Sequence, residues 1–343
     1  MHIDTDAWAI RYRSRVLDPV GRRLLVTNYH GTTQETDLTE PANCAGFGRV
    51  RHFRRFGGSD WVPNPLPLDP AFRALGMQPT DELRAQVFQN AACNWRCWYC
   101  FVPFELLSGN RKHAGWFSAA ELINLLLQEE YPPCVLDLSG GEPGLTPEWV
   151  LWIMTELQQR GLQDRFYVWS DDNLSTEYFW RFLSGDEQEI IAAYPMYGRV
   201  GCFKGFNEDS FSYNTGTTPD LFQRQFSVMQ RLLESGIDIY AYVTLTTPWR
   251  SSIQDGIRRF VDRLQALDDY LPLRTVPLEI RVFTPVERRI NEEHKSSLQN
   301  QWLALDAWRR ELQDRFSGEL RERCIFDVPL REQRPSTAAS LNG

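Results

Sequence analysis

Short β-rich runs alternate with helical patterns along the middle of the chain, and this order constrains the fold more than any other feature of the sequence. Six runs are candidate strands, over residues 83–90, 134–138, 165–169, 199–204, 237–245 and 278–283. Alternation of this kind implies parallel strands joined by right-handed crossovers. Because six units are too few to close an eight-stranded barrel, we expect an α/β fold with an open, partial (β/α)6 TIM-like barrel. A doubly wound sheet is the alternative.

Helix signals fall between these runs. Ser118 and Glu121 form a capping-box pattern before an apolar stripe, and residues 292–316 are predicted to form one long final helix. Other helix starts and ends are marked by Thr146-Pro147 with Gly161, Thr218-Pro219 with Gly236, and Ser252 with Asp255. Either α/β form places a reactive site at the carboxyl ends of the strands, so the residues that follow each predicted strand matter most.

The two ends of the chain differ in composition from its middle. Residues 1–80 contain several prolines and glycines and show no strong periodicity, so we expect an irregular N-terminal extension packed on the main domain. Residues 81–330 form the expected barrel domain. Residues 331–343 are polar and rich in small residues, which favours a disordered tail.

Composition narrows the function classes. A net charge of −8 argues against a general nucleic-acid binder, and we interpret the basic run at residues 49–55 as a solvated face. The sequence has no long uncharged apolar stretch that predicts a membrane span, and its acidic start lacks the apolar segment of a secretory signal. We therefore expect a cytoplasmic protein whose seven cysteines stay reduced and serve metal binding or catalysis.

Three of these cysteines, Cys93, Cys97 and Cys100, lie close together directly after the first predicted strand. Four protein thiolates fill an iron–sulfur cluster, whereas three leave one iron open to another ligand. A zinc site is the alternative, although structural zinc usually takes four ligands in two separated pairs, and His113 is the only nearby candidate for a fourth. The spacing favours an iron–sulfur cluster and leaves zinc as its rival.

Two motifs together resemble one known family. Tyr99 precedes the last cysteine of the C-x3-C-x2-C spacing, and the second predicted strand runs into Gly140-Gly141-Glu142. This pair of motifs resembles the signature of the radical S-adenosylmethionine (radical SAM) superfamily. The resemblance covers residues 83–283 and does not account for residues 1–80.

The resemblance implies an enzyme in which Cys93, Cys97 and Cys100 bind a [4Fe–4S] cluster. S-adenosyl-L-methionine would chelate the open iron. One electron from a reductant such as flavodoxin or ferredoxin would then cleave it into methionine and a 5′-deoxyadenosyl radical, which abstracts hydrogen from a substrate. Because the C-terminal part has no cysteine-rich block, we expect a single cluster.

The resemblance also implies which residues contact S-adenosylmethionine. The two glycines of the Gly-Gly-Glu motif would let the backbone approach the methionine part, and the glutamate would place a carboxylate beside its amino group. Ser170, Asp171 and Asn173, after the third predicted strand, are candidates for contacts to the ribose or the carboxylate. For Asn173 a helix cap is the alternative.

One further segment, residues 201–208, is similar to part of the glycyl-radical-enzyme activases. The similarity implies that Lys204 contacts the carboxylate of S-adenosylmethionine, with an ordinary surface lysine as the alternative. Cys202 stands where the activases have an aspartate, and we interpret it as a small buried residue.

No motif identifies the substrate. Tyr242 and Arg281 are candidate substrate contacts, since each lies on one face of a predicted strand and a guanidinium can hold a carboxylate or phosphate; a peripheral salt bridge is the alternative for Arg281. We expect a small-molecule or natural-product substrate. The alternatives are a protein-directed enzyme, namely a glycyl radical activase or a peptide maturase, and a non-catalytic zinc or electron-transfer protein.

Overall fold

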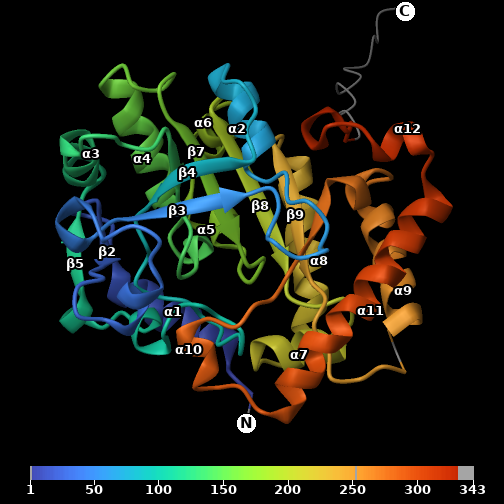
Figure 1. Ribbon diagram of the computed structural model, residues 1–343. Helices are drawn as coiled ribbons and strands as arrows, with labels where there is room; N and C mark the ends of the chain where they lie inside the picture. The colour runs from blue at the N-terminus through green and yellow to red at the C-terminus, as the bar shows by residue number, and fades with distance from the viewer. Residues whose placement is uncertain (1, 252, 331–343) are drawn as a thin grey trace, which may run out of the picture.

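A seven-stranded sheet forms the centre of the molecule (Figure 1). The computed structural model describes residues 2–251 and 253–330. In spatial order the strands are β10 (Thr275–Leu278), β9 (Ile239–Thr244), β8 (Tyr197–Phe203), β7 (Tyr167–Asp172), β6 (Val135–Asp137), β4 (Glu82–Val87) and β3 (Arg49–Arg54). β3 pairs antiparallel with β4, and the other neighbours pair parallel. The prediction of parallel strands joined by helical crossovers is confirmed.

The order of the parallel strands identifies the architecture. From β4 to β10 each strand of this sheet lies beside the next one along the chain. A doubly wound sheet reverses its direction near the middle, and this sheet does not, so the doubly wound alternative is wrong. The sheet is an open partial barrel, because β3 and β10 are its two edges. Every residue of β8 and β9 is buried, as expected for parallel strands covered on both faces.

Helices surround this sheet (Figure 1). Their bounds along the barrel are α3 (Ala119–Gln128), α4 (Pro147–Gln159), α5 (Tyr178–Phe182), α6 (Gly185–Ala192), α7 (Glu208–Thr215), α8 (Leu221–Glu234), α9 (Ile253–Leu267), α10 (Thr284–Glu287), α11 (Glu292–Arg315) and α12 (Gly318–Arg321). Ser118 and Glu121 form the predicted capping box, and α11 is the predicted long helix. Ser252 and the predicted tail at 331–343 lie outside the described residues. Within the described part of the chain, no helix is both long and apolar enough to cross a membrane.

The sixth strand lies earlier than predicted. β10 covers Thr275–Leu278, whereas the prediction was 278–283. The backbone of Ile280 bonds to a side chain instead of a strand: its N–H donates to Oε1 of Gln301 at 3.0 Å, and its carbonyl accepts from Nε2 of Gln301 at 3.0 Å. Because α11 satisfies these groups, Ile280 needs no strand partner, and residues 279–283 lie outside the sheet.

Residues 1–80 are not irregular throughout, and that part of the prediction is wrong. They contain α1 (Thr5–Val16), β1 (Leu17–Asp18), β2 (Arg23–Thr27), β3 and α2 (Leu68–Leu75). β2 pairs with β1 and with β5 (Ala114–Phe117), and β3 joins the main sheet at β4. These strands find most of their partners far along the chain, so local periodicity did not reveal them.

The segment 55–66, which we call the strap, leaves the end of β3 and reaches the opposite edge of the open sheet (Figure 1). Trp61 Nε1 donates to the carbonyl of Pro277 in β10 at 2.9 Å, and Ser59 Oγ donates to Glu279 at 3.0 Å. The Trp61 ring also packs edge-on against Trp302 of α11 at 5.0 Å. The strap therefore fills the gap between the two edge strands.

We expect Trp61→Ala to lower the free energy of unfolding by about 3 kcal/mol, because it removes a buried ring and leaves the carbonyl of Pro277 without its donor. Trp249→Ala is the control, since Trp249 is 47% exposed and should cost less than about 1 kcal/mol. Urea unfolding at equilibrium measures both. Equal losses in the two variants would show that the strap does not hold the sheet edges together.

Candidate functional site

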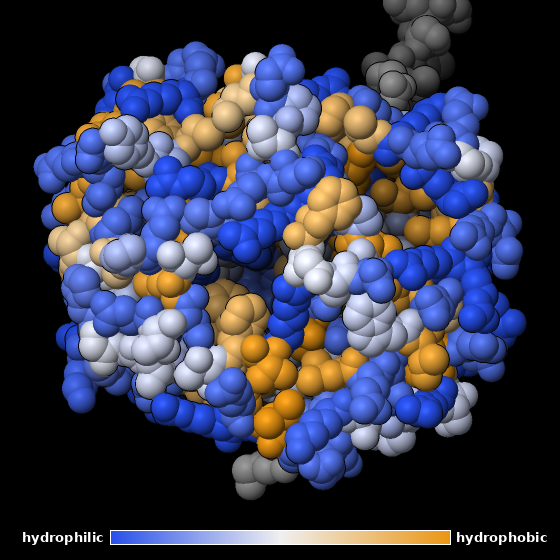
Figure 2. Space-filling view, viewed as in Figure 1, coloured by the Kyte–Doolittle hydropathy of each residue, from blue (hydrophilic) through white to orange (hydrophobic). Residues whose placement is uncertain are grey.

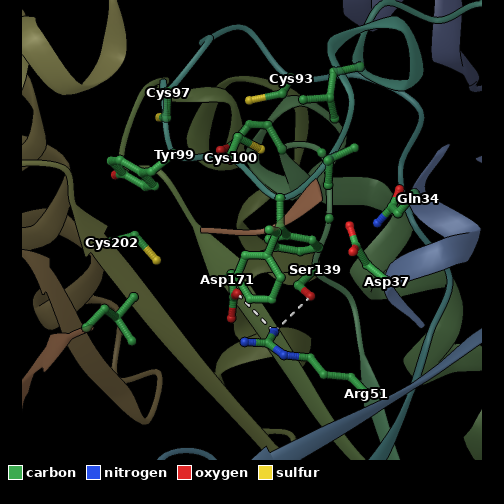
Figure 3. A pocket seen from close by; sticks show the side chains of 18 of the residues that line it. Gln34, Asp37, Arg51, Cys93, Cys97, Tyr99, Cys100, Ser139, Asp171 and Cys202 are labelled. Carbon is green, nitrogen blue, oxygen red and sulfur yellow. Dashed lines mark hydrogen bonds and ion pairs between the residues drawn. The ribbon is translucent and has the colours of Figure 1, made fainter. Parts of the chain in front are cut away.

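A cavity of about 420 Å³ lies at the carboxyl ends of the parallel strands. Figure 2 shows the molecule hollowed on this face, below β3 in the view of Figure 1. Figure 3 shows the cysteine loop along one side of the cavity and Arg51 on the opposite side. The sequence-predicted residues that line it are Cys93, Cys97, Cys100, Gly140, Gly141, Glu142, Asp171, Asn173, Lys204, Tyr242 and Arg281. One cavity thus brings together all of the predicted site residues except Ser170.

The three cysteines lie on the loop that follows β4, and all are free thiols. Burial raises the pKa of each thiol, to about 11 for Cys97. A cysteine binds metal as a thiolate, so metal binding by this loop would require positive charge nearby. Across the described residues, no group of three or more His, Cys, Asp and Glu side chains is placed to hold a single metal ion. His113, the nearby candidate for a fourth zinc ligand, does not line the cavity.

The Gly140-Gly141 turn fits closely against the loop that carries Cys93. Both glycines have positive φ, +78° and +65°. A Cβ on Gly141 would lie 2.2 Å from the carbonyl oxygen of Asn90 and 2.5 Å from that of Ala92. The next residue, Glu142, donates its N–H to the same Ala92 carbonyl at 2.7 Å. Glycine is needed here because two loops of the site touch through their backbones.

Glu142 is fully buried, and its carboxylate organises neighbouring backbone. Its oxygens accept N–H donors from Gly144 at 2.7 Å and from Asn173 at 3.1 Å. Burial and the nearby carboxylate of Asp172 raise the pKa of Glu142 to about 8. A cation entering the cavity beside Glu142 would relieve this penalty.

Of the three candidate residues at the end of β7, only two line the cavity. Asp171 and Asn173 line it, while Ser170 points the other way and its Oγ lies 2.7 Å from the hydroxyl of Tyr197. Successive side chains of a strand alternate between faces, so the assignment of Ser170 to this site is wrong. Asn173 is not a helix cap, since α5 begins at Tyr178; its Nδ2 lies 3.5 Å from Sγ of Cys93.

Lys204 follows β8 and reaches the cavity with its ammonium unpaired among the described residues. Burial opposes its charge, but the neighbouring thiols of Cys202 and Cys97 and the hydroxyl of Tyr99 raise the pKa of Lys204 well above its usual value. It is therefore not a surface lysine. Cys202 also lines the cavity, from the wall that faces the cysteine loop (Figure 3).

Both candidate substrate contacts are already engaged. The Tyr242 hydroxyl donates to the carbonyl of Leu66 at 3.1 Å and lies 3.3 Å from Asn64 in the strap. Arg281 forms a salt bridge with Glu279, and this is the peripheral salt bridge named as its alternative. Arg281 also donates to the carbonyl of Gly57. These two side chains hold the strap against the barrel.

The N-terminal region supplies cavity residues that the sequence analysis missed. Arg51 of β3 is directed into the cavity, where its Nη1 bonds to Asp137 at 3.0 Å and lies 3.6 Å from Asp171 (Figure 3). Gln34 and Asp37 line another wall. The basic run at 49–55 is thus not a solvated face throughout. Its alternation places Arg49 and Arg51 on one side of a strand, but their burial follows from pairing with β4, which local pattern does not reveal.

Neither a protein-family model nor a curated protein sequence matches this chain. Among solved structures, Streptococcus suis SuiB bound to precursor peptide SuiA aligns with a TM-score of 0.38 and 16% identity, over 53% of this chain and 36% of that one. SuiB bound to S-adenosylmethionine gives 0.38 and 17%, over 53% and 37%. The protein anSMEcpe with bound AdoMet gives 0.36 and 13%, over 51% and 44%. The match thus spans less than half of each of these proteins, and at such TM-scores it carries no argument about the site.

We expect Gly141→Ala to destabilise the protein by at least about 3 kcal/mol, because the new methyl group would overlap two carbonyl oxygens. Gly76→Ala is a matched control: Gly76 has nearly the same φ, +64°, but nothing lies within 4 Å of an added Cβ. Its cost should be only the roughly 1–2 kcal/mol of left-handed backbone. Equal losses in urea unfolding would contradict the close fit of the two loops.

The stability of the metal-free protein should fall as pH rises from 4.5, the ordinary pKa of glutamate, to about 8. Folded Glu142 keeps a proton that the unfolded chain releases over this range, so each pH unit costs at most about 1.4 kcal/mol. Glu142→Gln should flatten this slope. If the slope measured by urea unfolding at several pH values is the same in both proteins, Glu142 is not the group responsible.

Proposed function

We propose that this chain is a radical SAM enzyme in which Cys93, Cys97 and Cys100 hold a [4Fe–4S] cluster and the adjoining cavity binds S-adenosylmethionine. One observation carries the proposal: the loop that carries the cysteine triplet and the Gly-Gly-Glu turn touch each other at the carboxyl edge of an open parallel barrel and face one cavity. Either motif alone is compatible with an ordinary loop, whereas their convergence at this edge supports a shared function.

The donor set fits such a cluster. Thiolates are its usual protein ligands, and three of them leave one iron for a second molecule. Held by Cys93, Cys97 and Cys100 and reduced by an external donor, such a cluster would supply one electron to cleave S-adenosylmethionine into methionine and a 5′-deoxyadenosyl radical able to remove hydrogen from a substrate. The loop is largely buried, with Cys93 7% and Cys97 9% exposed, which protects reactive species from water.

The cavity offers charges that match the methionine part of S-adenosylmethionine. The unpaired ammonium of Lys204 is suited to its carboxylate, and the buried carboxylate of Glu142 is suited to its amino group. Asp171 and Asn173 stand at the end of β7 for ribose or carboxylate contacts. The protein's part is to hold these groups in place and to exclude water.

The closure of the cavity favours a small-molecule substrate over a protein. The strap occupies the open side of the barrel, where an extended peptide would otherwise enter. A second contact between distant segments lies near the cavity wall, where the Thr284 hydroxyl at the start of α10 donates to the carboxylate of Asp37 at 2.6 Å. A small molecule needs less room than a peptide segment, so we propose a small-molecule or natural-product substrate. The electron would come from an external reductant such as flavodoxin or ferredoxin.

Anaerobic reconstitution tests this proposal. The wild-type protein should bind about four iron ions per chain and release 5′-deoxyadenosine when given dithionite and S-adenosylmethionine. Cys93→Ala, Cys97→Ala and Cys100→Ala should each lose most of the iron and all of the product. Cys134→Ala is the control and should behave as wild type, because Cys134 does not line the cavity.

The variant Cys202→Ala tests whether three or four cysteines bind the cluster. If three cysteines hold the cluster, this variant keeps its iron, although its thiol faces the same cavity. Loss of iron as complete as in Cys97→Ala would mean a cluster saturated by the protein, with no iron left for S-adenosylmethionine. Stoichiometric zinc without iron in the wild type would instead support the zinc or electron-transfer alternative.

A further inference from the structure

Two arginines from distant parts of the chain hold the backbone of the cysteine loop. Arg96 lies inside the loop, and its Nη1 donates to the carbonyls of Cys93 at 2.6 Å and Trp95 at 2.7 Å. Its Nη2 donates to the carbonyl of Leu107 at 3.1 Å, which also accepts the N–H of Cys93. The start of the loop is thereby tied to its end.

Arg289 holds the other two cysteines from the turn after α10. Its Nη2 donates to the carbonyl of Cys100, and its Nη1 lies 3.5 Å from the carbonyl of Cys97. Its own position is set by Nε, which donates to the carbonyl of Pro285 at 2.7 Å. The last barrel connection therefore reaches back to the first strand's loop.

Phe104 joins the two arginines. The guanidinium of Arg289 lies 4.1 Å from the centre of its ring, and that of Arg96 lies 5.6 Å from it. A guanidinium over an aromatic face is attracted by the ring quadrupole, so the ring fixes both cations. Each of the three cysteine carbonyls is thus contacted by one of two cations that share a single ring.

We propose that Arg96 and Arg289 are positioning residues that set the reduction potential of the cluster; this inference rests on the proposed function. Three thiolates and a reduced cluster bring negative charge into a buried loop, which is unfavourable without nearby positive charge. Two fixed guanidinium groups stabilise the reduced state, which carries one electron more, relative to the oxidised state. They also keep the ligand-bearing backbone in place without contacting the sulfur atoms.

Arg289→Met tests the proposal on the reconstituted full-length protein. We expect its midpoint potential, followed by absorbance or electron paramagnetic resonance during a redox titration, to shift to more negative values than in the wild type. Arg289→Lys restores the charge but not the bridge between two carbonyls, so its potential should lie between the two. Arg288→Met is the matched control, since Arg288 is the exposed neighbour and should leave the potential unchanged.

Each outcome decides the proposal. A wild-type potential in Arg289→Met, at full iron content, overturns it while leaving the proposed function intact. Should Arg289→Met retain no iron, Arg289→Gln takes its place as a second variant without the charge, and a wild-type potential at full iron content in that variant overturns it equally. A shift of the same size in Arg288→Met overturns it too, because a surface charge would then act as strongly. A wild-type protein without iron overturns both the inference and the proposed function.

Discussion

The site depends on one backbone contact, the hydrogen bond from the N–H of Glu142 to the carbonyl of Ala92. It joins the turn after β6 to the loop after β4, and it forms only because Gly141 leaves room for the carbonyls of residues 90 and 92. Through this contact the buried carboxylate of Glu142 is placed beside the cysteine loop. Asn173 then extends the arrangement to β7, with its N–H on Glu142 and its amide near Cys93.

Much of this arrangement could be predicted from the sequence. The alternation of strands and helices predicts a parallel sheet, and a parallel sheet gathers whatever follows its strands at one edge. One cavity is lined by residues that follow strands or, like Asp171, lie at the end of one: the cysteine triplet, the Gly-Gly-Glu turn, Asp171, Asn173 and Lys204. The prediction that Ser170 belongs to this site does not hold, because it treated a run of polar residues as one block. Side chains alternate between the two faces of a strand, and Ser170 points away from the cavity.

The rest could not be predicted, because it depends on partners distant in the chain. The strands of residues 1–80 are short and pair with β4 and β5, so no local periodicity marks them. The partial burial of Arg51 follows from the same pairing, and its contact to Asp137 joins residues far apart in sequence. The end of β10 was misplaced because Gln301, a side chain of α11, takes the backbone bonds that a strand partner would have taken.

The strap has a consequence for how the protein is made. Trp61 is synthesised 216 residues before Pro277, whose carbonyl accepts its hydrogen bond. Contacts between such distant residues form slowly, because a long loop must close first. On the ribosome the side wall of the cavity therefore assembles well after the cysteine loop has emerged. Until that wall closes, the flank of the barrel beside the three thiols of the cysteine loop stays open.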